Sequence, residues 1–312
     1  MVFDDLQKQY PLLTTTAAYL EGRCYFFKGV LKQIREINPA LDFGEELCNK
    51  ALELCNRDWN VYLKRVDALI EFSLEFLRLQ IELEKTGRYK YATFKEVEEK
   101  VYNDSSRVLV GPWYTWALFY SQFFWVTHQR VFKFFIDEFV SSSPASGSVL
   151  EVPSGTGLYL TYFLKNKPSW QGVGVDISES AKVFTEDVLR VYDIGSDRCL
   201  FVLEDLHTYE PRQKFDRIMC GEFLEHVEDP FAVLSRLHGF LKNDGKFFVT
   251  VAVWAAMIDH IYLYRSAEEV RKDLQRAGFE IEKELVQAVF KGKSPESEKT
   301  PVNYCAILRK RN

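Results

Sequence analysis

Apolar residues follow two different periods along the chain. Through residues 1–140 they recur at helical spacing, as in 62–77, where an apolar stripe lies opposite a charged face. Through residues 148–312, short runs rich in β-branched and aromatic residues alternate with helical segments. Residues 141–147, between the two parts, are mostly small and polar. We therefore predict a helical domain over 1–140 and a second domain over 148–312.

The second part reads as an α/β fold. The strand candidates are 149–152, 172–176, 199–204, 215–220 and 246–253, and the helix candidates are 158–165, 179–192, 230–241 and 267–277. This alternation predicts a mostly parallel sheet covered on both faces. The runs 279–289 and 302–309 follow one another without a helix, so we expect them to pair antiparallel.

The first part reads as helices. We expect them over 14–37, 43–55 and 62–86, with Thr93 and Glu96 forming a capping box for a short one after that. Aromatic residues are dense on nearly every face of 113–140, which predicts a buried helix.

Composition narrows the function classes. The chain of 312 residues carries 40 Lys and Arg against 45 Asp and Glu, a net charge of −5, which argues against a nucleic-acid partner. Six Cys without CxxC spacing are typical of reduced core thiols, and we expect a cytoplasmic protein. A signal peptide and an apolar stretch long enough to cross a membrane are both missing, so no membrane partner is expected.

A glycine loop between the first strand and helix predicts a βαβ nucleotide site. A dinucleotide fingerprint needs a third small residue after Gly155 and Gly157, but Leu160 stands there. Glu151 precedes the loop and would repel pyrophosphate, whereas it would favour a cationic ligand such as S-adenosyl-L-methionine (SAM). Asp176 ends the second strand and suits the two ribose hydroxyls.

This loop resembles the first motif of class I SAM-dependent methyltransferases, E-x-G-x-G-x-G, with Pro153 in place of the first glycine. The sequence LEHVEDP at 224–230, followed by a helix and LKNDG, is similar to small-molecule methyltransferases of the ubiquinone-biosynthesis type. The resemblance implies a Rossmann-like sheet of order 3-2-1-4-5-7-6 with an antiparallel last strand. It covers about 148–312 and does not identify the N-terminal helices, which we expect to form a cap. It assigns the following residues to SAM: Glu151, Pro153, Ser154, Gly155, Gly157, Asp176, Ile177, Asp205, Leu206, Cys220, Gly221 and Glu222. Glu204 is the alternative to Asp205 for the adenine.

Two histidines are the candidate catalytic residues. The resemblance implies that the segment containing His226 passes the methionine end of SAM. An imidazole pKa near neutrality suits a general base. His260 lies just beyond the fifth strand, at the same sheet edge.

The same segment also predicts a metal site. Glu222, Glu225 and His226 form E-x-x-E-H, which would share one face of a helical turn. The triplet resembles the motif of metal-dependent O-methyltransferases that act on quinol rings or on small-RNA termini, with His260 as a fourth ligand. A divalent cation (Mg, Zn or Fe), a metal-free pair of His226 and His260, and merely structural histidines are three open alternatives.

Acceptor-binding candidates come from two segments. Helices before this kind of core often cover the active site, so Trp113, Tyr114 and Tyr120 are expected to line the acceptor pocket or simply to join the two domains. Tyr262 and Arg265 follow His260 and could border the acceptor, although Arg265 could equally cap the next helix. We expect methyl transfer to an O or N atom of a small, partly apolar molecule. An RNA 2′-O-methyltransferase and a non-catalytic SAM-binding protein are the alternatives.

Overall fold

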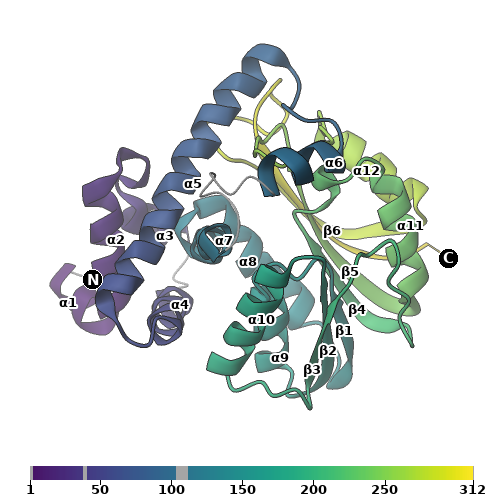
Figure 1. Ribbon diagram of the computed structural model, residues 1–312, viewed down its shortest axis with the longest axis horizontal. Coiled ribbons are helices and arrows are strands. Elements are labelled where there is room, and N and C mark those ends of the chain that lie inside the picture. The colour runs from purple at the N-terminus through teal and green to yellow at the C-terminus, as the bar shows by residue number, and fades with distance from the viewer. Residues whose placement is uncertain (1–2, 38–40, 103–111, 312) are drawn as a thin grey trace.

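A computed structural model describes residues 3–37, 41–102 and 112–311 (Figure 1). Its centre is a seven-stranded sheet of order β3-β2-β1-β4-β5-β7-β6, in which only β7 runs antiparallel to its neighbours. The strands are β1 Ser146–Glu151, β2 Ser169–Asp176, β3 Cys199–Leu203, β4 Phe215–Gly221, β5 Leu241–Val253, β6 Phe279–Ala288 and β7 Val302–Lys310. The predicted strand order and antiparallel hairpin are confirmed.

Helices cover both faces of the sheet. They are α9 Leu158–Asn166, α10 Glu179–Val191, α11 Pro230–Phe240 and α12 Ala267–Arg276. The apolar residues of α11 and α12 pack with one face of β5, whereas those of α9 and α10 belong to the core on the other face. This arrangement follows from strands whose residues are buried on both sides.

The N-terminal part is helical, as predicted, and it packs on the α9 side of the sheet (Figure 1). Its helices are α1 Phe3–Gln9, α2 Pro11–Arg23, α3 Val30–Ile37, α4 Leu41–Leu54, α5 Trp59–Thr86, α6 Phe94–Val97, α7 Pro112–Phe124 and α8 Val126–Phe134, with π-helical turns at Glu98–Tyr102 and Phe135–Val140. Aromatic rings join this part to the sheet; the ring centroids of Phe135 and Phe248 lie 5.1 Å apart. One apolar core therefore runs from the helices into the sheet.

Two segments that read as continuous helices are interrupted. The segment 14–37 contains a 3-10 turn, Tyr25–Phe27, between α2 and α3. The aromatic segment breaks at Trp125, whose backbone is extended (φ −94°, ψ 119°). The reason is tertiary: the Trp125 indole packs on Phe72 and donates a hydrogen bond to the Ser73 hydroxyl at 3.0 Å.

The predicted helix ends are confirmed at α5 and α6. Gly87 ends α5 with a left-handed backbone (φ 69°), and its N–H bonds to the Leu83 carbonyl. Thr93 caps α6 by accepting from the Glu96 N–H at 3.2 Å. Of the helices in the described ranges, none is both long enough and apolar enough to cross a membrane.

Candidate functional site

The glycine loop joins β1 to α9 at the carboxyl edge of the sheet. Gly155 (φ 52°) and Gly157 (φ 65°) both have left-handed backbones, which glycine adopts without strain. A Cβ at Gly157 would lie 2.5 Å from Thr185 Cγ2, so this position also requires the missing side chain. The Val152–Pro153 peptide bond at the loop entry is cis.

Asp176 at the end of β2 holds the loop in place. Its carboxylate accepts hydrogen bonds from the Gly155 and Ser178 N–H groups, each at 2.9 Å. The side chain is 7% exposed, and burial raises its pKa while the two N–H groups act against that rise. Each carboxylate oxygen has a second lone pair, so the predicted contact with ribose hydroxyls is chemically available.

Two further loop residues are buried and polar. Glu151 accepts from the Leu160 N–H at 3.3 Å, at the start of α9, and burial raises its pKa well above the usual value. The Ser154 hydroxyl is buried and has no hydrogen-bond partner. The loop therefore has one buried acid and one unsatisfied hydroxyl, a combination that is uncommon in a site with only structural roles.

The ends of β2 and β3 place the residues assigned to the adenosine. Ile177 is 57% exposed, and Leu206 is buried. Asp205 is half-buried and accepts from the His207 N–H at 2.8 Å, forming an Asx turn. The Glu204 N–H continues the ladder by donating to the Asp176 carbonyl at 2.9 Å.

The E-x-x-E-H segment after β4 differs from the predicted helical turn. Cys220 is buried inside the strand, and the strand ends at Gly221. Glu222 has a left-handed backbone (φ 46°), and its N–H bonds to the Thr250 hydroxyl at 2.9 Å. Only Leu224–His226 is helical, as one 3-10 turn. Three residues cannot carry i, i+3 and i+4 on one face, so the single-turn prediction is wrong.

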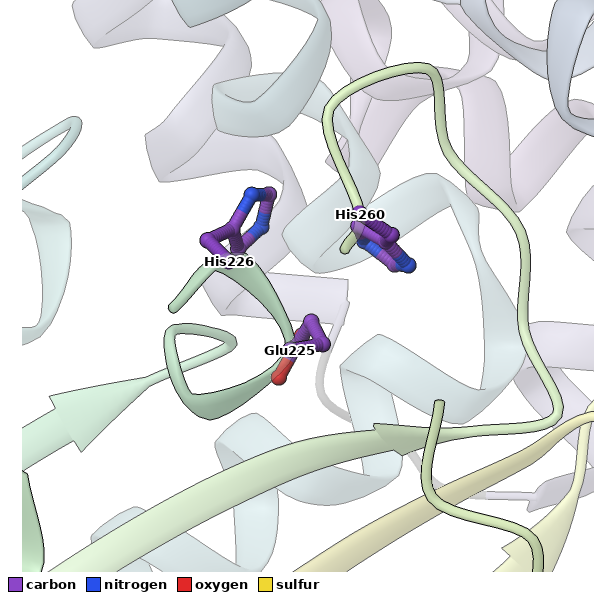
Figure 2. A group of neighbouring side chains, drawn as sticks. All are labelled: Glu225, His226 and His260. Atoms are coloured by element: carbon purple, nitrogen blue, oxygen red, sulfur yellow. The ribbon is translucent and has the colours of Figure 1, made fainter. Parts of the chain in front are cut away.

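Three of the four predicted metal ligands nevertheless meet. Glu225, His226 and His260 each offer a ligand atom, and these atoms lie within 4.8 Å of one another. Figure 2 shows Glu225 and His226 on the turn after β4 and His260 on the loop after β5. The two imidazole centroids are 4.7 Å apart in an edge-to-face arrangement. Glu222 is not one of these three residues. Burial raises its pKa, and burial and then the Glu222 charge raise the pKa of Glu225.

Main-chain carbonyls fix how both imidazoles are protonated. The His260 Nδ1 lies 2.9 Å from the Ala255 carbonyl, and the His226 Nδ1 lies 3.2 Å from the Asp259 carbonyl. Because a carbonyl only accepts, each Nδ1 carries a hydrogen, and the neutral form of each ring has its lone pair on Nε2. Burial, aided by neighbouring His226, lowers the pKa of His260 to about 3. His260 is therefore a neutral ligand or base at pH 7.

Glu225 is the least satisfied group of the cluster. It is 0% exposed, neither carboxylate oxygen has a hydrogen-bond partner, and burial raises its pKa well above the usual value. Its main-chain carbonyl accepts from the Ile261 and Tyr262 N–H groups, which ties the turn after β4 to the loop after β5. An unpaired buried carboxyl group is costly unless a proton, a cation or a ligand satisfies it.

The structure adds Asp259, which sequence reasoning passed over. Asp259 is 4% exposed, and its Oδ2 accepts from the Tyr102 hydroxyl at 3.1 Å and lies 3.6 Å from His226 Nδ1. Its other oxygen, Oδ1, is buried without a partner. A carboxylate next to the candidate His260 was the available signal in the sequence.

The aromatic candidates separate into two groups. Tyr114 is half-buried and packs its ring 5.6 Å from that of Phe72, and burial and then the Asp259 charge raise its pKa well above the usual value. Trp113 is half-buried, and its indole N–H has no partner. Tyr120 instead packs within the helical part, with its ring 6.0 Å from that of Tyr62. Tyr120 is therefore in the helical core, whereas the charge of Asp259 acts on Tyr114.

The two candidates after His260 also differ. Tyr262 is half-buried and packs its ring 4.8 Å from that of Tyr264. Arg265 is exposed, lies over the Trp254 ring at 5.4 Å and donates to the Gly87 carbonyl at 3.3 Å. Its side chain therefore joins the end of α5 to the loop after β5 and lies outside the cluster.

Comparisons with known proteins agree with this architecture. Residues 150–247 match the family model described as a methyltransferase domain. The ubiquinone biosynthesis O-methyltransferase of Xanthomonas axonopodis pv. citri is 29% identical over 200 residues, which cover 55% of this chain and 81% of the relative. The (S)-coclaurine N-methyltransferase of Papaver somniferum is 29% identical over 102 residues, 33% of this chain.

These similarities cover different shares of the proteins. The chain spans 28% of the length of the coclaurine enzyme, and 40% and 64% of two further curated relatives. The solved structure of the mitomycin 7-O-methyltransferase MmcR has a TM-score of 0.52 at 14% identity, covering 76% of this chain and 68% of that one. At that identity the likeness concerns the fold.

Proposed function

Because residues 150–247 lie in a class I SAM-dependent methyltransferase domain, we propose that the protein transfers the methyl group of SAM to a small acceptor. The methylated atom is an oxygen or nitrogen of a partly apolar molecule. The observation that carries this proposal is the link between Asp176 and Gly155, which fixes a loop with two left-handed glycines at the carboxyl edge of the sheet. Similarity to O- and N-methyltransferases supports the acceptor class.

The chain's own groups suit an in-line displacement. Loop residues and Asp176 orient the donor, and SAM supplies a methyl group on a positively charged sulfur. The acceptor's lone pair attacks that methyl group, and S-adenosylhomocysteine leaves. Where no cation is bound, His226 Nε2 takes the acceptor proton, because its Nδ1 already donates to the Asp259 carbonyl; with a cation on Nε2, the cation would take over this role. Most of the rate comes from the alignment of the acceptor with the methyl group.

We further propose that Glu225, His226 and His260 hold a divalent cation. The donor set fits: two imidazoles keep Nε2 free, their Nδ1 atoms donate to carbonyls as in many metal sites, and a buried carboxyl group lacks a partner. Two imidazole nitrogen donors favour Zn or Fe over Mg. Such an ion would lower the pKa of an acceptor hydroxyl. Glu222 is left out of this ligand set.

One experiment tests both parts. Calorimetry with S-adenosylhomocysteine tests cofactor binding, and SAM turnover is measured across pools of phenols, alcohols, amines and short RNAs, with and without chelator. Turnover of small molecules that a chelator abolishes and Zn²⁺ or Fe²⁺ restores supports both proposals. Turnover that ignores the chelator leaves the histidines as a metal-free pair. Salt-sensitive turnover of RNA favours a nucleic-acid enzyme, and cofactor binding without any turnover favours a non-catalytic protein.

A further inference from the structure

We infer that the N-terminal helical part positions both histidines of the cluster through the loop 254–260. Gln80, Tyr89 and Tyr102 are the positioning residues, and none of them lies in the matched domain 150–247. The inference rests on the metal site proposed above.

Gln80 clamps the start of this loop. It lies in the last third of α5 and is 2% exposed. Its Nε2 donates to the Trp254 carbonyl at 2.9 Å, and its Oε1 accepts from the Ala256 N–H at 3.1 Å. One side chain therefore satisfies the main chain on both sides of Ala255, as a neighbouring strand would.

The backbone at this point requires external support. Trp254 has a left-handed conformation (φ 49°), which is unfavourable for a bulky residue. Such conformations persist where surrounding contacts hold them. Two hydrogen bonds hold Trp254 in this way. Gln80 donates to the Trp254 carbonyl, and the Trp254 N–H donates to the Tyr264 carbonyl at 3.0 Å.

Tyr89 acts on the atom that orients His260. The Tyr89 hydroxyl donates to the Ala255 carbonyl at 2.8 Å, and the same oxygen accepts from His260 Nδ1 at 2.9 Å. The Tyr89 ring also lies edge-on to the imidazole, with centroids 5.3 Å apart. The position of this one carbonyl therefore sets the direction of the free His260 Nε2.

Tyr102 acts on the other histidine through Asp259. It follows α6 and donates to Asp259 Oδ2 at 3.1 Å, while the Asp259 carbonyl accepts from His226 Nδ1 at 3.2 Å. The two carbonyls that accept from the Nδ1 atoms, those of Ala255 and Asp259, thus belong to one loop. Side chains from the helical part hold that loop at both ends. Residues of this kind behind metal ligands tune metal affinity.

The test compares Gln80→Met with the matched control Gln129→Met. Gln129 is a buried glutamine of α8 whose amide has no hydrogen-bond partner. Co²⁺ alone is titrated into each purified full-length protein and followed by its visible absorption, and S-adenosylhomocysteine affinity is measured in parallel. We expect Gln80→Met to weaken Co²⁺ binding about tenfold, with S-adenosylhomocysteine affinity within about twofold of wild type, and Gln129→Met to leave Co²⁺ affinity unchanged. If Gln80→Met does not fold, Tyr89→Phe is used, with an expected loss of at least about threefold.

Histidine ¹⁵N NMR of the metal-free protein supplies a second readout. We expect His260 to be protonated on Nδ1 in wild type and to become a mixture of tautomers in the Gln80→Met or Tyr89→Phe protein. If these variants bind Co²⁺ as wild type does and keep the wild-type tautomer, the inference is overturned and the metal site stands. If the wild-type protein binds no Co²⁺, the metal site is overturned. The comparison of tautomers then decides by itself whether the helical part positions the histidines. Failure to bind S-adenosylhomocysteine counts against the cofactor proposal instead.

Discussion

Gly172 of β2 lies directly against Leu160 of α9. A Cβ at Gly172 would come within 3.0 Å of Leu160 Cδ1 and 2.8 Å of Leu164 Cδ1. In a dinucleotide loop a third small residue on the helix permits this close helix–sheet approach. Here the helix carries the large residue, Leu160, and the strand carries the glycine. The small residue that allows the helix and the sheet to approach is therefore on the strand.

This packing predicts the cost of a methyl group at residue 172. We expect Gly172→Ala to lower the free energy of unfolding by about 1–3 kcal/mol, because the added Cβ overlaps two leucine side chains. Urea unfolding provides the measurement. Gly174→Ala on the same strand is the control, since its Cβ would meet nothing nearer than 3.3 Å and should cost less. Equal costs at the two positions would contradict this account.

The loop glycine Gly157 makes a sharper prediction. Gly157→Ala forces a left-handed alanine and places its Cβ 2.5 Å from Thr185 Cγ2, so we expect a loss of about 2 kcal/mol or more in unfolding free energy. We also expect S-adenosylhomocysteine binding to fall by at least about tenfold, because the loop must shift. Gly239→Ala, near the end of α11 with open space around it, should instead be neutral or stabilise by about 0.5 kcal/mol. A Gly157→Ala protein as stable as wild type would show that the loop tolerates a side chain.

The sequence predicted the order of the strands well because most of them contain a separate apolar run, although β5 begins at Leu241, before the predicted 246. The predicted strand 215–220 and helix 179–192 differ from the observed elements by one residue at one end. The antiparallel hairpin followed from the missing crossover helix. The local hydrophobic pattern was sufficient to predict these elements, because burial on both faces and short connections leave few alternative arrangements for the strands and helices.

The helical part and the cluster depended on long-range contacts that spacing does not reveal. The break at Trp125 comes from its bond to Ser73, more than fifty positions earlier in the chain. Glu222 lies outside the metal cluster: its N–H bonds to the Thr250 hydroxyl, and its backbone is left-handed rather than helical. His226 and His260 were predicted to share a sheet edge, but the carbonyls that orient them could be found only in three dimensions.

Asp176 gives a prediction about cofactor binding. Asp176→Asn keeps the size of the side chain but turns an accepting oxygen into an NH₂ group that faces the Gly155 or Ser178 N–H. We expect S-adenosylhomocysteine affinity to fall roughly 10- to 100-fold in calorimetry, as for the loss of charge-assisted hydrogen bonds. Asp187→Asn on the exposed side of α10 removes the same charge and should have no effect. Unchanged affinity in Asp176→Asn would remove this carboxylate from the binding site.

His128 predicts how stability changes with pH. Burial lowers its pKa to about 4, below the unfolded value of about 6.5, so the unfolded chain binds the proton more readily between these values. The stability that His128 contributes is therefore complete above pH 6.5 and is lost as the pH falls towards 4. In urea unfolding at pH 7 and pH 4.5, we expect His128→Gln to lose less stability on acidification than wild type does, by on the order of 2 kcal/mol.

The comparison between the two proteins isolates His128, because every other titrating group stays in both. His260, whose pKa burial lowers to about 3, destabilises both proteins in the same acidic range and cancels. His207→Gln replaces an exposed histidine and controls for the loss of an imidazole as such. Parallel stability curves for wild type and His128→Gln between pH 7 and 4.5 would mean that the His128 ring accepts its proton as easily folded as unfolded. Its hydrogen bond with the Ser121 hydroxyl, at 3.0 Å from Nδ1, would then have to compensate for burial.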